Sequence, residues 1–494
     1  MIGKMKIFLA VLLTFSLLLT AGCGAANTDS DHSSDTDVTS SETVNSSSQE
    51  PSSDEQSSDE SSSQGESNMS STTSETPSNN TTTSSEVSSN TSSNNSSNNS
   101  SNTSSEVSSN TSSENKVEVV APKPTVTSTF ADYINYANGL PNTYKKLNED
   151  KALNVVYIGG SLTNGTGGSP CWRVLVTQWF DTYYPNADIN HYNSGIGGTG
   201  SRYGAYRLER DVLSHEPDLV FIDFAINDIY KKETTKEERV LYETLIREIL
   251  EAYPDCEIVS VFFTDNSNAA LSYRNSLIRT AEAQKEVGDY YGIPSINAAS
   301  ALIKGVMGKD YANVWSKYFT DIVHASALGY KAYADCIIEF LANSLFNKQY
   351  TDADYGNKAM PEMYGDMLYD GNRTNDTANL ADLTYSNNAG GNGFTITTTG
   401  GVPIYNASGA GATFVYSFTG TEIGFYSTYY GKYSMEISID GGDFEKYSYT
   451  QDDNCVILYD DLEAGQHTIT IKATSATVQI GAFLTRDATK QTVK

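Results

Sequence analysis

The fold of this chain is decided by one stretch of its sequence, Val155-Val156-Tyr157-Ile158-Gly159-Gly160-Ser161-Leu162-Thr163. Its apolar first half predicts a buried β-strand, and the two glycines predict a tight turn that presents Ser161 at the end of that strand. Ligands of open α/β sheets gather at the carboxyl ends of the strands, where this serine would lie. A phosphate-binding loop is disfavoured because no Gly-Lys-Ser/Thr follows the glycines. Taken alone, the segment also fits an ordinary turn without chemistry.

Strands and helices alternate on both sides of this turn, from about Pro124 to Lys348. Runs of Val, Ile and aromatic residues predict the strands Leu153 to Ile158, Ile189 to Tyr192, Leu219 to Ile222 and Ile258 to Phe263. Apolar residues at three- and four-residue spacing predict the helices Trp172 to Tyr184, Ala205 to Ser214, Lys236 to Ala252, Ala270 to Tyr290 and Ala325 to Leu345. This alternation predicts a parallel sheet covered on both faces, a three-layer α/β domain that we place at residues 123–349.

The pattern changes after about Tyr350 to short alternating segments separated by Gly, Asn and Asp. The expected strands are Phe394 to Thr398, Thr413 to Phe418, Glu422 to Tyr426, Ser434 to Ile439, Cys455 to Tyr459, His467 to Ala473 and Val478 to Leu484. Asp440-Gly441-Gly442 is typical of a hairpin turn. Strands at this spacing predict a second domain at residues 350–494, an all-β sandwich.

Residues 24–122 are expected to be a disordered linker. From Gly24 to Asn115 the chain has no Lys, Arg, Phe, Tyr or Trp and consists almost entirely of Ser, Thr, Asn, Asp and Glu. Such a stretch cannot bury enough apolar area to offset its ordering entropy. It carries 15 acidic residues, about half of the formal net charge of -29. The remainder has no block of Lys or Arg, which argues against nucleic acid as a partner and favours a neutral ligand.

The first 23 residues predict export. Lys4 and Lys6 precede an apolar run from Ile7 to Leu19, which is too short for a comfortable membrane span and typical of a signal peptide. The run ends in Thr20-Ala21-Gly22-Cys23, which resembles a bacterial lipobox, although Thr20 stands where Leu is commoner. The resemblance implies lipidation of Cys23 and a protein anchored at the extracellular face of the cell membrane. Simple cleavage and secretion is the alternative.

The other four cysteines, Cys171, Cys256, Cys336 and Cys455, are widely spaced. None falls in a Cys-x-x-Cys or Cys/His cluster, so no metal site is expected. Buried free thiols are the favoured interpretation, and one disulfide is the alternative because an exported protein meets no reducing compartment.

A catalytic serine needs a base, and the chain has five histidines. Four are placed in the linker, in the second predicted strand, at a helix end and in the sandwich: His32, His191, His215 and His467. The remaining one, His324, follows Asp321 by three residues, and a carboxylate at that spacing could orient the second ring nitrogen. Helix capping by Asp321 is the alternative interpretation.

Two further segments could supply donors for an oxyanion, because each follows a predicted strand. The loop Asn193-Ser194-Gly195-Ile196-Gly197-Gly198-Thr199 could point a backbone N–H into the cleft. Phe224-Ala225-Ile226-Asn227-Asp228 places an amide side chain at the end of the third strand. Each segment also has an ordinary explanation as a turn.

These four segments occur in the order of the four sequence blocks of SGNH (GDSL-like) hydrolases, and the chain resembles the Gly-Gly-Ser-x-Thr branch of that family from Asn154 to the helix after His324. The resemblance implies Ser161 as nucleophile, with Asp321 and His324 completing the triad. It implies an oxyanion hole made by the N–H groups of Ser161 and Gly198 and the side chain of Asn227.

Two residues depart from the family pattern. Gly160 stands where the family name has Asp, and Ala325 stands where Pro often follows the His. The first departure blurs the substrate class without removing the chemistry. No Gly-x-Ser-x-Gly elbow occurs in the chain, which disfavours an α/β-hydrolase lipase.

The C-terminal domain resembles the jelly-roll accessory domains of some SGNH carbohydrate esterases. Three segments carry this resemblance: Gly420 to Phe425, Ile437 to Gly442 and Gly465 to Ile469. Its tyrosines at Tyr426, Tyr429, Tyr430 and Tyr433 either pack within the sandwich or stack on sugar rings.

These two resemblances imply an extracellular serine esterase that removes O-acetyl or other short acyl groups from a polysaccharide through an acyl-enzyme. No metal or organic cofactor is implied. The alternatives are an O-acetyltransferase with the same triad and a non-catalytic, tethered carbohydrate-binding protein. The glycan, the acylated position and the oligomeric state are not specified by the sequence.

Overall fold

The structure is a computed structural model that describes residues 119–231, 233–356, 359–364, 373–376, 384–386, 394–399, 402–407, 409–428, 431–450, 454–475 and 477–486. The expectations for the signal peptide, Cys23 and most of the linker fall outside the described residues and stay predictions. Among the described residues, no helix is long and apolar enough to cross a membrane.

A six-stranded sheet forms the centre of the first part of the chain, in the order β1-β6-β5-β4-β2-β3. Its strands are β1 (Ile134–Asn135), β2 (Ala152–Gly159), β3 (Asp188–Gly195), β4 (Leu219–Asp223), β5 (Glu257–Val261) and β6 (Ser295–Ile296). All neighbours from β6 to β3 are parallel, and β1 is antiparallel to β6. The predicted parallel sheet is confirmed, with two short strands added at one edge.

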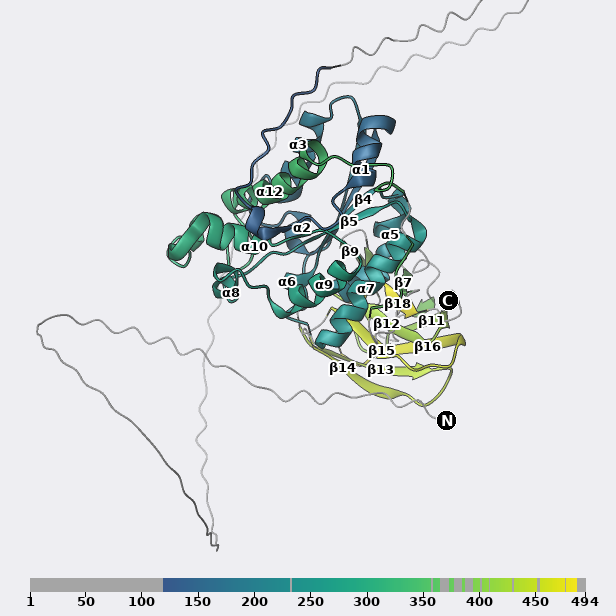
Figure 1. The fold of residues 1–494 in the computed structure, drawn as a ribbon. Coiled ribbons are helices and arrows are strands. Elements are labelled where there is room, and N and C mark those ends of the chain that lie inside the picture. The colour runs from purple at the N-terminus through teal and green to yellow at the C-terminus, as the bar shows by residue number, and fades with distance from the viewer. Residues whose placement is uncertain are drawn as a thin grey trace, which may run out of the picture. The chain divides into compact units, whose positions relative to one another are not determined.

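Helices cover both faces of this sheet because successive residues of its central strands point to opposite sides. Val155 and Tyr157 of β2 pack with helices α3 (Trp172–Tyr183) and α12 (Ala327–Ala342). The alternate residues Val156 and Ile158 pack with helices α5 (Leu208–Asp211) and α7 (Thr235–Ala252). Figure 1 shows α3 and α12 on one side of the sheet and α7 and α9 on the other. The three-layer α/β architecture is thus confirmed.

The remaining helices are short, apart from α9. They are α1 (Pro141–Lys145), α2 (Ser161–Asn164), α4 (Ser201–Tyr206), α6 (Ala225–Asp228), α8 (Ala269–Tyr273), α9 (Arg279–Tyr290), α10 (Ala298–Ser300) and α11 (Trp315–Tyr318). Two predicted helices are wrong as single elements. The segment Ala205 to Ser214 breaks at Arg207 between α4 and α5, and Ala270 to Tyr290 breaks between α8 and α9, where Asn275 has a φ of 61°.

The C-terminal part is built of antiparallel strands only, as far as the structure describes it. They are β7 (Arg373–Asp376), β8 (Thr384–Ser386), β9 (Phe394–Thr399), β10 (Val402–Ala407), β11 (Thr413–Gly420), β12 (Glu422–Tyr426), β13 (Tyr433–Ile439), β14 (Glu445–Tyr449), β15 (Cys455–Tyr459), β16 (Gly465–Ala473), β17 (Val478–Ile480) and β18 (Phe483–Arg486). They form sheets in the orders β14-β13-β16-β11-β8, β15-β12-β18-β7 and β17-β10-β9.

Two of these sheets enclose one core, which confirms the predicted β-rich second domain. Ile437 and Ile471 of the five-stranded sheet pack in one buried cluster with Phe425 and Phe483 of the four-stranded sheet. The predicted hairpin lies between β13 and β14, where Asp440 and Gly441 have φ angles of 51° and 73°. Positive φ at both central residues is what a type I′ turn requires, and it explains this Asp-Gly pair. The jelly-roll connectivity and the domain boundaries stay predictions.

The four cysteines expected to be structural are all buried free thiols in the structure: Cys171, Cys256, Cys336 and Cys455. The favoured interpretation of these residues is therefore confirmed, and the alternative of a disulfide is not realised.

Candidate active site

The Gly-Gly-Ser turn is fixed at the carboxyl end of β2 by contacts with the neighbouring strand β4. The N–H of Gly160 donates to the carbonyl oxygen of Asp223, at 3.2 Å. The hydroxyl of Thr163 donates to the carboxyl of the same Asp223, at 2.8 Å, and both side chains are buried. Ser161 starts the short helix α2 between these two anchors. The serine is therefore held at the sheet edge where strand ends meet.

The loop before α12 places His324 opposite this serine. Backbone hydrogen bonds close the loop, with Thr320 N–H donating to the oxygen of His324 at 2.8 Å and Ser326 N–H donating to that of Tyr318 at 2.8 Å. The indole N–H of Trp315 donates to the oxygen of Asp321 at 2.7 Å. Ala325, which replaces the more usual Pro, is buried within this loop. The backbone hydrogen bonds and the Trp315 indole thus give His324 a defined position.

The three side chains form one chain of hydrogen bonds. Nδ1 of His324 lies 2.7 Å from a carboxylate oxygen of Asp321, and Nε2 lies 2.9 Å from the hydroxyl of Ser161. Because the Asp321 carboxylate accepts a hydrogen bond from Nδ1–H, Nε2 is the acceptor for the serine hydroxyl. This arrangement can deprotonate Ser161 as it attacks a carbonyl and can stabilise the imidazolium that results.

The carboxylate of Asp321 does more than orient the imidazole. Its other oxygen accepts the N–H groups of Val323, at 2.8 Å, and His324, at 2.7 Å. Partial burial works to raise the pKa of Asp321, but these hydrogen bonds and the contact with the His324 ring outweigh it and hold the pKa below its usual value. Asp321 therefore stays ionised beside the imidazole at neutral pH.

The capping interpretation of Asp321 is wrong for the helix itself. The N-cap of α12 is Ser326, whose hydroxyl oxygen accepts the N–H of Gly329 at 3.3 Å. Asp321 lies five residues earlier and caps only its own tight turn.

The expected oxyanion donors surround the same serine. Among the described residues, the N–H groups of Ser161 and Gly198 have no hydrogen-bond partner. The side-chain amide of Asn227 donates one N–H to the carbonyl oxygen of Thr199, at 2.7 Å, which leaves its second N–H for a ligand. A Cβ built on Gly197 would lie 3.7 Å from the Cβ of Ser161, so this loop adjoins the nucleophile.

The same contacts give a physical reason for glycine at position 160. A Cβ built on Gly160 would lie only 1.9 Å from Nδ2 of Asn227. Any side chain here would displace the amide that the family resemblance assigns to the oxyanion hole. The departure from the family name therefore follows from a close approach of Asn227 to the backbone.

The other histidines that the structure describes lie away from this site. His191 is in β3, where its Nδ1 is 3.1 Å from the hydroxyl of Tyr157, and His215 ends a short helical turn before β4. His467, in β16, contacts Asp440 at 2.7 Å, but its other ring nitrogen is 2.7 Å from the oxygen of Glu463. The elimination that selected His324 agrees with the geometry. The described residues contain no cluster of His, Cys, Asp and Glu suited to a metal ion.

Two buried residues support the site and were missed in the sequence. Burial raises the pKa of Asp223 to about 7, although the Thr163 hydroxyl opposes the shift. Arg207 is fully buried, and its guanidinium donates to the oxygens of Ser194, at 2.7 Å, and Gly159, at 3.1 Å. Arg207 thereby ties together the ends of β2 and β3. Neither residue belongs to a recognisable sequence pattern, so only their burial reveals them.

A third buried group holds the loop that carries Gly198. Asp228 accepts the N–H of Ser201 at 2.8 Å and its hydroxyl at 2.6 Å. Gln284 donates to Asp228 at 2.9 Å and to Glu238 at 2.6 Å. Burial raises the pKa of Glu238 well above its ordinary value, and the neighbouring charge of Asp228 raises it further. A neutral Glu238 limits the cost of burying the second carboxylate.

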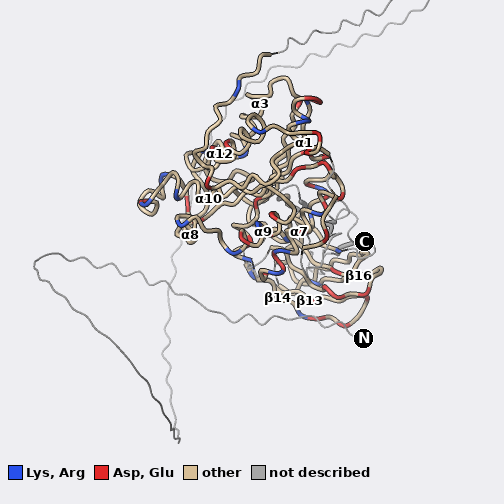
Figure 2. Tube along the Cα trace, in the orientation of Figure 1, with Lys and Arg blue, Asp and Glu red and all other residues tan. Residues whose placement is uncertain are grey.

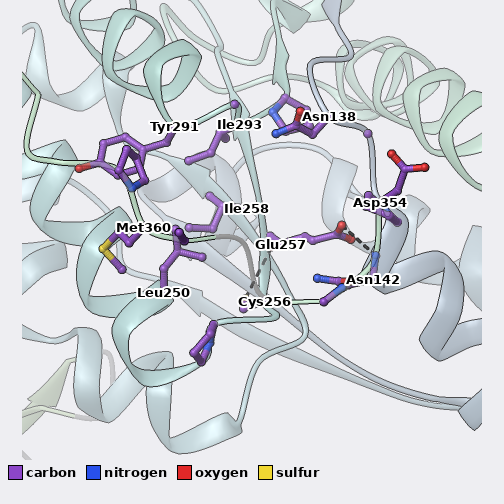
Figure 3. Close-up of a pocket in the computed structure, with 18 of the residues that line it drawn as sticks. Asn138, Asn142, Leu250, Cys256, Glu257, Ile258, Tyr291, Ile293, Asp354 and Met360 are labelled. Atoms are coloured by element: carbon purple, nitrogen blue, oxygen red, sulfur yellow. Dashed lines mark hydrogen bonds between the residues drawn. The ribbon is translucent and has the colours of Figure 1, made fainter. Parts of the chain in front are cut away.

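A cavity of about 380 Å³ lies elsewhere in the described part of the chain and contains none of the triad residues. It is at the amino ends of β5 and β6, with Glu257, Ile258, Ile293 and Met360 among its lining residues, as Figure 3 shows. Its Glu257 carboxylate accepts the N–H groups of Asn142 and Thr143, at 3.0 and 2.8 Å. The side chains of Ser161, His324 and Asp321 therefore lie outside this cavity.

Comparisons with known proteins agree with this geometry. Residues 157–332 match the family model of the GDSL-like Lipase/Acylhydrolase family. The chain is similar to the crystal structure of a two-domain esterase (CEX) active on acetylated mannans, with 20% identity, a TM-score of 0.57, and coverage of 72% of this chain and 99% of that one. The same esterase co-crystallised with mannopentaose gives a TM-score of 0.55 at 20% identity, covering 72% and 98%. A search of curated proteins finds no match. At this identity the structural likeness establishes the fold, an α/β domain followed by a β-rich one.

Proposed function

We propose that this chain is a serine esterase that removes O-acetyl or other short acyl groups from a polysaccharide. Its residues 157–332 are a domain of the GDSL-like lipase/acylhydrolase (SGNH) family. The observation that carries the proposal is the unbroken series of hydrogen bonds from Asp321 through His324 to Ser161. A structural serine at the end of a strand has no need of such a partner.

The proposed reaction has two halves. In the first, Ser161 Oγ attacks the ester carbonyl carbon while its proton passes to Nε2 of His324. The carbonyl oxygen becomes an oxyanion bound by the N–H groups of Ser161 and Gly198 and the side-chain amide of Asn227. When the tetrahedral intermediate collapses, His324 returns the proton to the departing sugar oxygen, which leaves an acyl-enzyme on Ser161.

In the second half, water replaces the sugar. His324 takes a proton from the water as it attacks the acyl carbon, and Ser161 leaves with that proton when the second tetrahedral intermediate collapses. The products are the carboxylic acid, which releases its proton to solvent, the sugar hydroxyl and the free enzyme. Asp321 keeps the imidazole in the tautomer that accepts at Nε2 in both halves, and each oxyanion donor contributes on the order of 3 kcal/mol.

An acetylated polysaccharide is supported as the substrate by two independent features. The similar two-domain esterase is described as active on acetylated mannans, and the likeness covers 72% of this chain and 99% of that one. In the described part of this chain, acidic and basic residues are spread over several elements, as Figure 2 shows, which suits a neutral polymer better than a polyanion.

The location and organisation proposed for the protein follow from its sequence. We propose a signal peptide and lipobox at residues 1–23, lipidation of Cys23, a linker at 24–122, a catalytic domain at 123–349 and an accessory domain at 350–494. The anchor would hold the enzyme at the extracellular face of the cell membrane. A flexible linker of about 100 residues spans on the order of 50 Å, which lets the catalytic domain reach polymers beyond the lipid surface.

The direct experiment measures acetate release from acetylated xylan, mannan, pectin and peptidoglycan by the full-length protein. Wild type and Ser214→Ala should release acetate from at least one polymer, and Ser161→Ala should release none. Ser214 is an exposed serine before the start of β4 and serves as the matched control. Equal activity of wild type and Ser161→Ala would refute the proposal.

The same assay separates the two alternatives. An O-acetyltransferase would move label from an acetylated donor glycan to an unacetylated one without free acetate. A non-catalytic binding protein would retain glycan in a pull-down assay and release no acetate, with equal retention by Ser161→Ala.

A further inference from the structure

The loop that carries Gly198 has two supports, one from the α/β part of the chain and one from the C-terminal β-strands. On the first side, Asn227 binds the oxygen of Thr199 and Asp228 binds Ser201. These contacts fix the end of the loop that leads into α4. The start of the loop is also bonded to the α/β part, because the N–H of Ile196 donates to the oxygen of Gly159 at 3.0 Å, but the carbonyl of Gly198 is bound from the second side.

The second support begins with a shared apolar core. Ile196, Tyr203 and Tyr206, from the loop and α4, pack in one buried cluster with C-terminal residues that include Tyr426 and Cys455. The rings of Tyr203 and Tyr426 are stacked, with centroids 4.2 Å apart and planes inclined by 4°. Tyr203 and Tyr426 are each 1% exposed, so water is excluded between them. A tethered accessory domain that moved independently would leave these aromatic faces in water.

A buried polar contact accompanies this core. The hydroxyl of Tyr206 donates to the carboxyl of Glu422 in β12, and both side chains are buried. Burial raises the pKa of Glu422 to about 7, while the charges of Arg486 and Arg202 work in the opposite direction. A buried carboxyl that is bonded to the other domain indicates a fixed interface.

One side chain extends from this interface to the loop that carries Gly198. The side-chain amide of Asn454, the residue before β15, donates to the carbonyl oxygen of Gly198 at 3.4 Å. Its side-chain oxygen accepts from the ammonium of Lys231 at 3.0 Å. Its own backbone oxygen accepts the N–H of Ser427 at 2.8 Å, which ties Asn454 to β12 and its neighbours. The amide of Asn454 is thus held by the C-terminal strands on one side and by Lys231 on the other.

The hydrogen bond from Asn454 to Gly198 bears on catalysis because it engages the carbonyl oxygen of Gly198 and not its N–H. The Gly198 carbonyl is bound by Asn454, whereas the Gly198 N–H has no partner among the described residues. Gly198 has a φ of 75°, a conformation that an unrestrained glycine leaves easily. Restraining the carbonyl restrains the neighbouring peptide groups, and with them the direction of the N–H that would meet the oxyanion.

We propose that the C-terminal domain is a structural part of the active site, and that Asn454 is a positioning residue that holds the Gly198 loop in the orientation needed for the oxyanion. This inference rests on the esterase function proposed above. It differs from a role in sugar binding because it predicts an effect on substrates that contain no sugar.

The test uses the full-length protein and 4-nitrophenyl acetate, an ester without a glycan. Asn454→Asp keeps the acceptor for Lys231 but removes the donor to Gly198, so it preserves the interface while releasing the loop. We expect kcat to fall about 3- to 30-fold with KM changed less than 2-fold, since a displaced donor is felt in the transition state. Asn406→Asp is the matched control. Among the described residues, the side chain of Asn406 bonds only to the C-terminal strands, so this change should leave both constants unchanged.

Two outcomes distinguish a failure of the positioning role of Asn454 from a failure of the proposed esterase function. If Asn454→Asp keeps the wild-type kcat while Ser161→Ala is inactive, the positioning role is refuted and the esterase stands. If Ser161→Ala is as active as wild type, the proposed function itself fails. The melting temperature of each variant is measured alongside, and Asn454→Ala, which removes both contacts without adding a charge, gives a second measurement if Asn454→Asp folds poorly. Wild-type kcat in a folded Asn454→Ala would equally overturn the proposal.

Discussion

Replacing Gly160 by alanine is expected to disable the proposed oxyanion hole without touching the proposed triad. The added Cβ would lie 1.9 Å from Nδ2 of Asn227, and the next nearest atom is the side-chain carbon of the same amide, at 3.0 Å. The clash is thus directed at one side chain. The nearest atoms outside the adjoining residues belong to Asn227 and Thr199 and none to His324, so His324 should keep its position as the acceptor of the Ser161 hydroxyl.

The size of the effect follows from these distances. Bringing the two atoms from 1.9 Å to an ordinary contact of 3.4 Å requires a displacement of about 1.5 Å, more than the roughly 1 Å that costs catalysis about a hundredfold. Removal of a single oxyanion donor costs about 10² to 10³ in kcat, or roughly 3 to 4 kcal/mol. We therefore expect kcat of Gly160→Ala to fall by about 10² to 10³, with a smaller change in KM.

A double-mutant cycle shows whether the loss acts through Asn227. The assay is the steady-state hydrolysis of 4-nitrophenyl acetate by Gly160→Ala, Asn227→Ala and the double variant. If alanine at position 160 acts by displacing Asn227, the double variant should be no slower than the slower single variant. Gly288→Ala is the control, because its Cβ would meet its nearest neighbour at an ordinary 3.6 Å. Wild-type kcat in Gly160→Ala, or losses that multiply in the double variant, would refute the reasoning.

Three further results are expected from single substitutions. Asp321→Asn should lower kcat by about 10² to 10⁴ because the imidazole of His324 loses the acceptor that fixes its tautomer; near-wild-type kcat would contradict this. The pKa of Asp223 in the folded protein is raised to about 7, so its ionisation opposes folding increasingly as pH rises from about 4 to 7. The melting temperature of Asp223→Asn should therefore rise relative to wild type between pH 5 and 8, by the equivalent of 1 to about 4 kcal/mol. A difference in melting temperature that does not depend on pH would refute this prediction. Burial works to lower the pKa of His467, but hydrogen bonds to Asp440 and a backbone oxygen raise the pKa overall. The stabilisation that the His467 side chain provides is therefore complete below about pH 6.5 and is lost as pH rises through the folded pKa. The amount by which His467→Gln melts below wild type should shrink between pH 6 and 9, with kcat unchanged.

The parts of the fold that sequence patterns predict are those decided by local chemistry. Val155 to Ile158 of β2 form a continuous apolar run because both faces of the strand are covered there. The hairpin at Asp440 has residues that tolerate a positive φ. Helix α7 begins with a capping box between Thr234 and Glu237. The helix predicted from Ala205 to Ser214 failed for a tertiary reason. At Arg207 the chain leaves helical geometry and the buried guanidinium binds strand ends that lie far away in the sequence.

The residues of the candidate site likewise include some that sequence patterns predict and some that they do not. Ser161, Asp321 and His324 could be predicted because each stands in a short segment with few chemical explanations and because the other histidines could be set aside. Asp223 and Asn454 could not be predicted, since their importance depends on which atoms they meet across long sequence separations. An isolated Asn before a strand carries no pattern that distinguishes it from a turn residue.

The central claim is that Ser161 is the nucleophile of an esterase, and covalent labelling tests it most directly. The full-length protein is treated with a fluorophosphonate, the residual hydrolysis of an acetyl ester is followed over time, and the labelled residue is located by peptide mapping. We predict a single phosphonylated residue, Ser161, with activity lost in proportion to its labelling. Full activity after complete labelling of Ser161, or loss of activity with the label on another residue, would contradict the account.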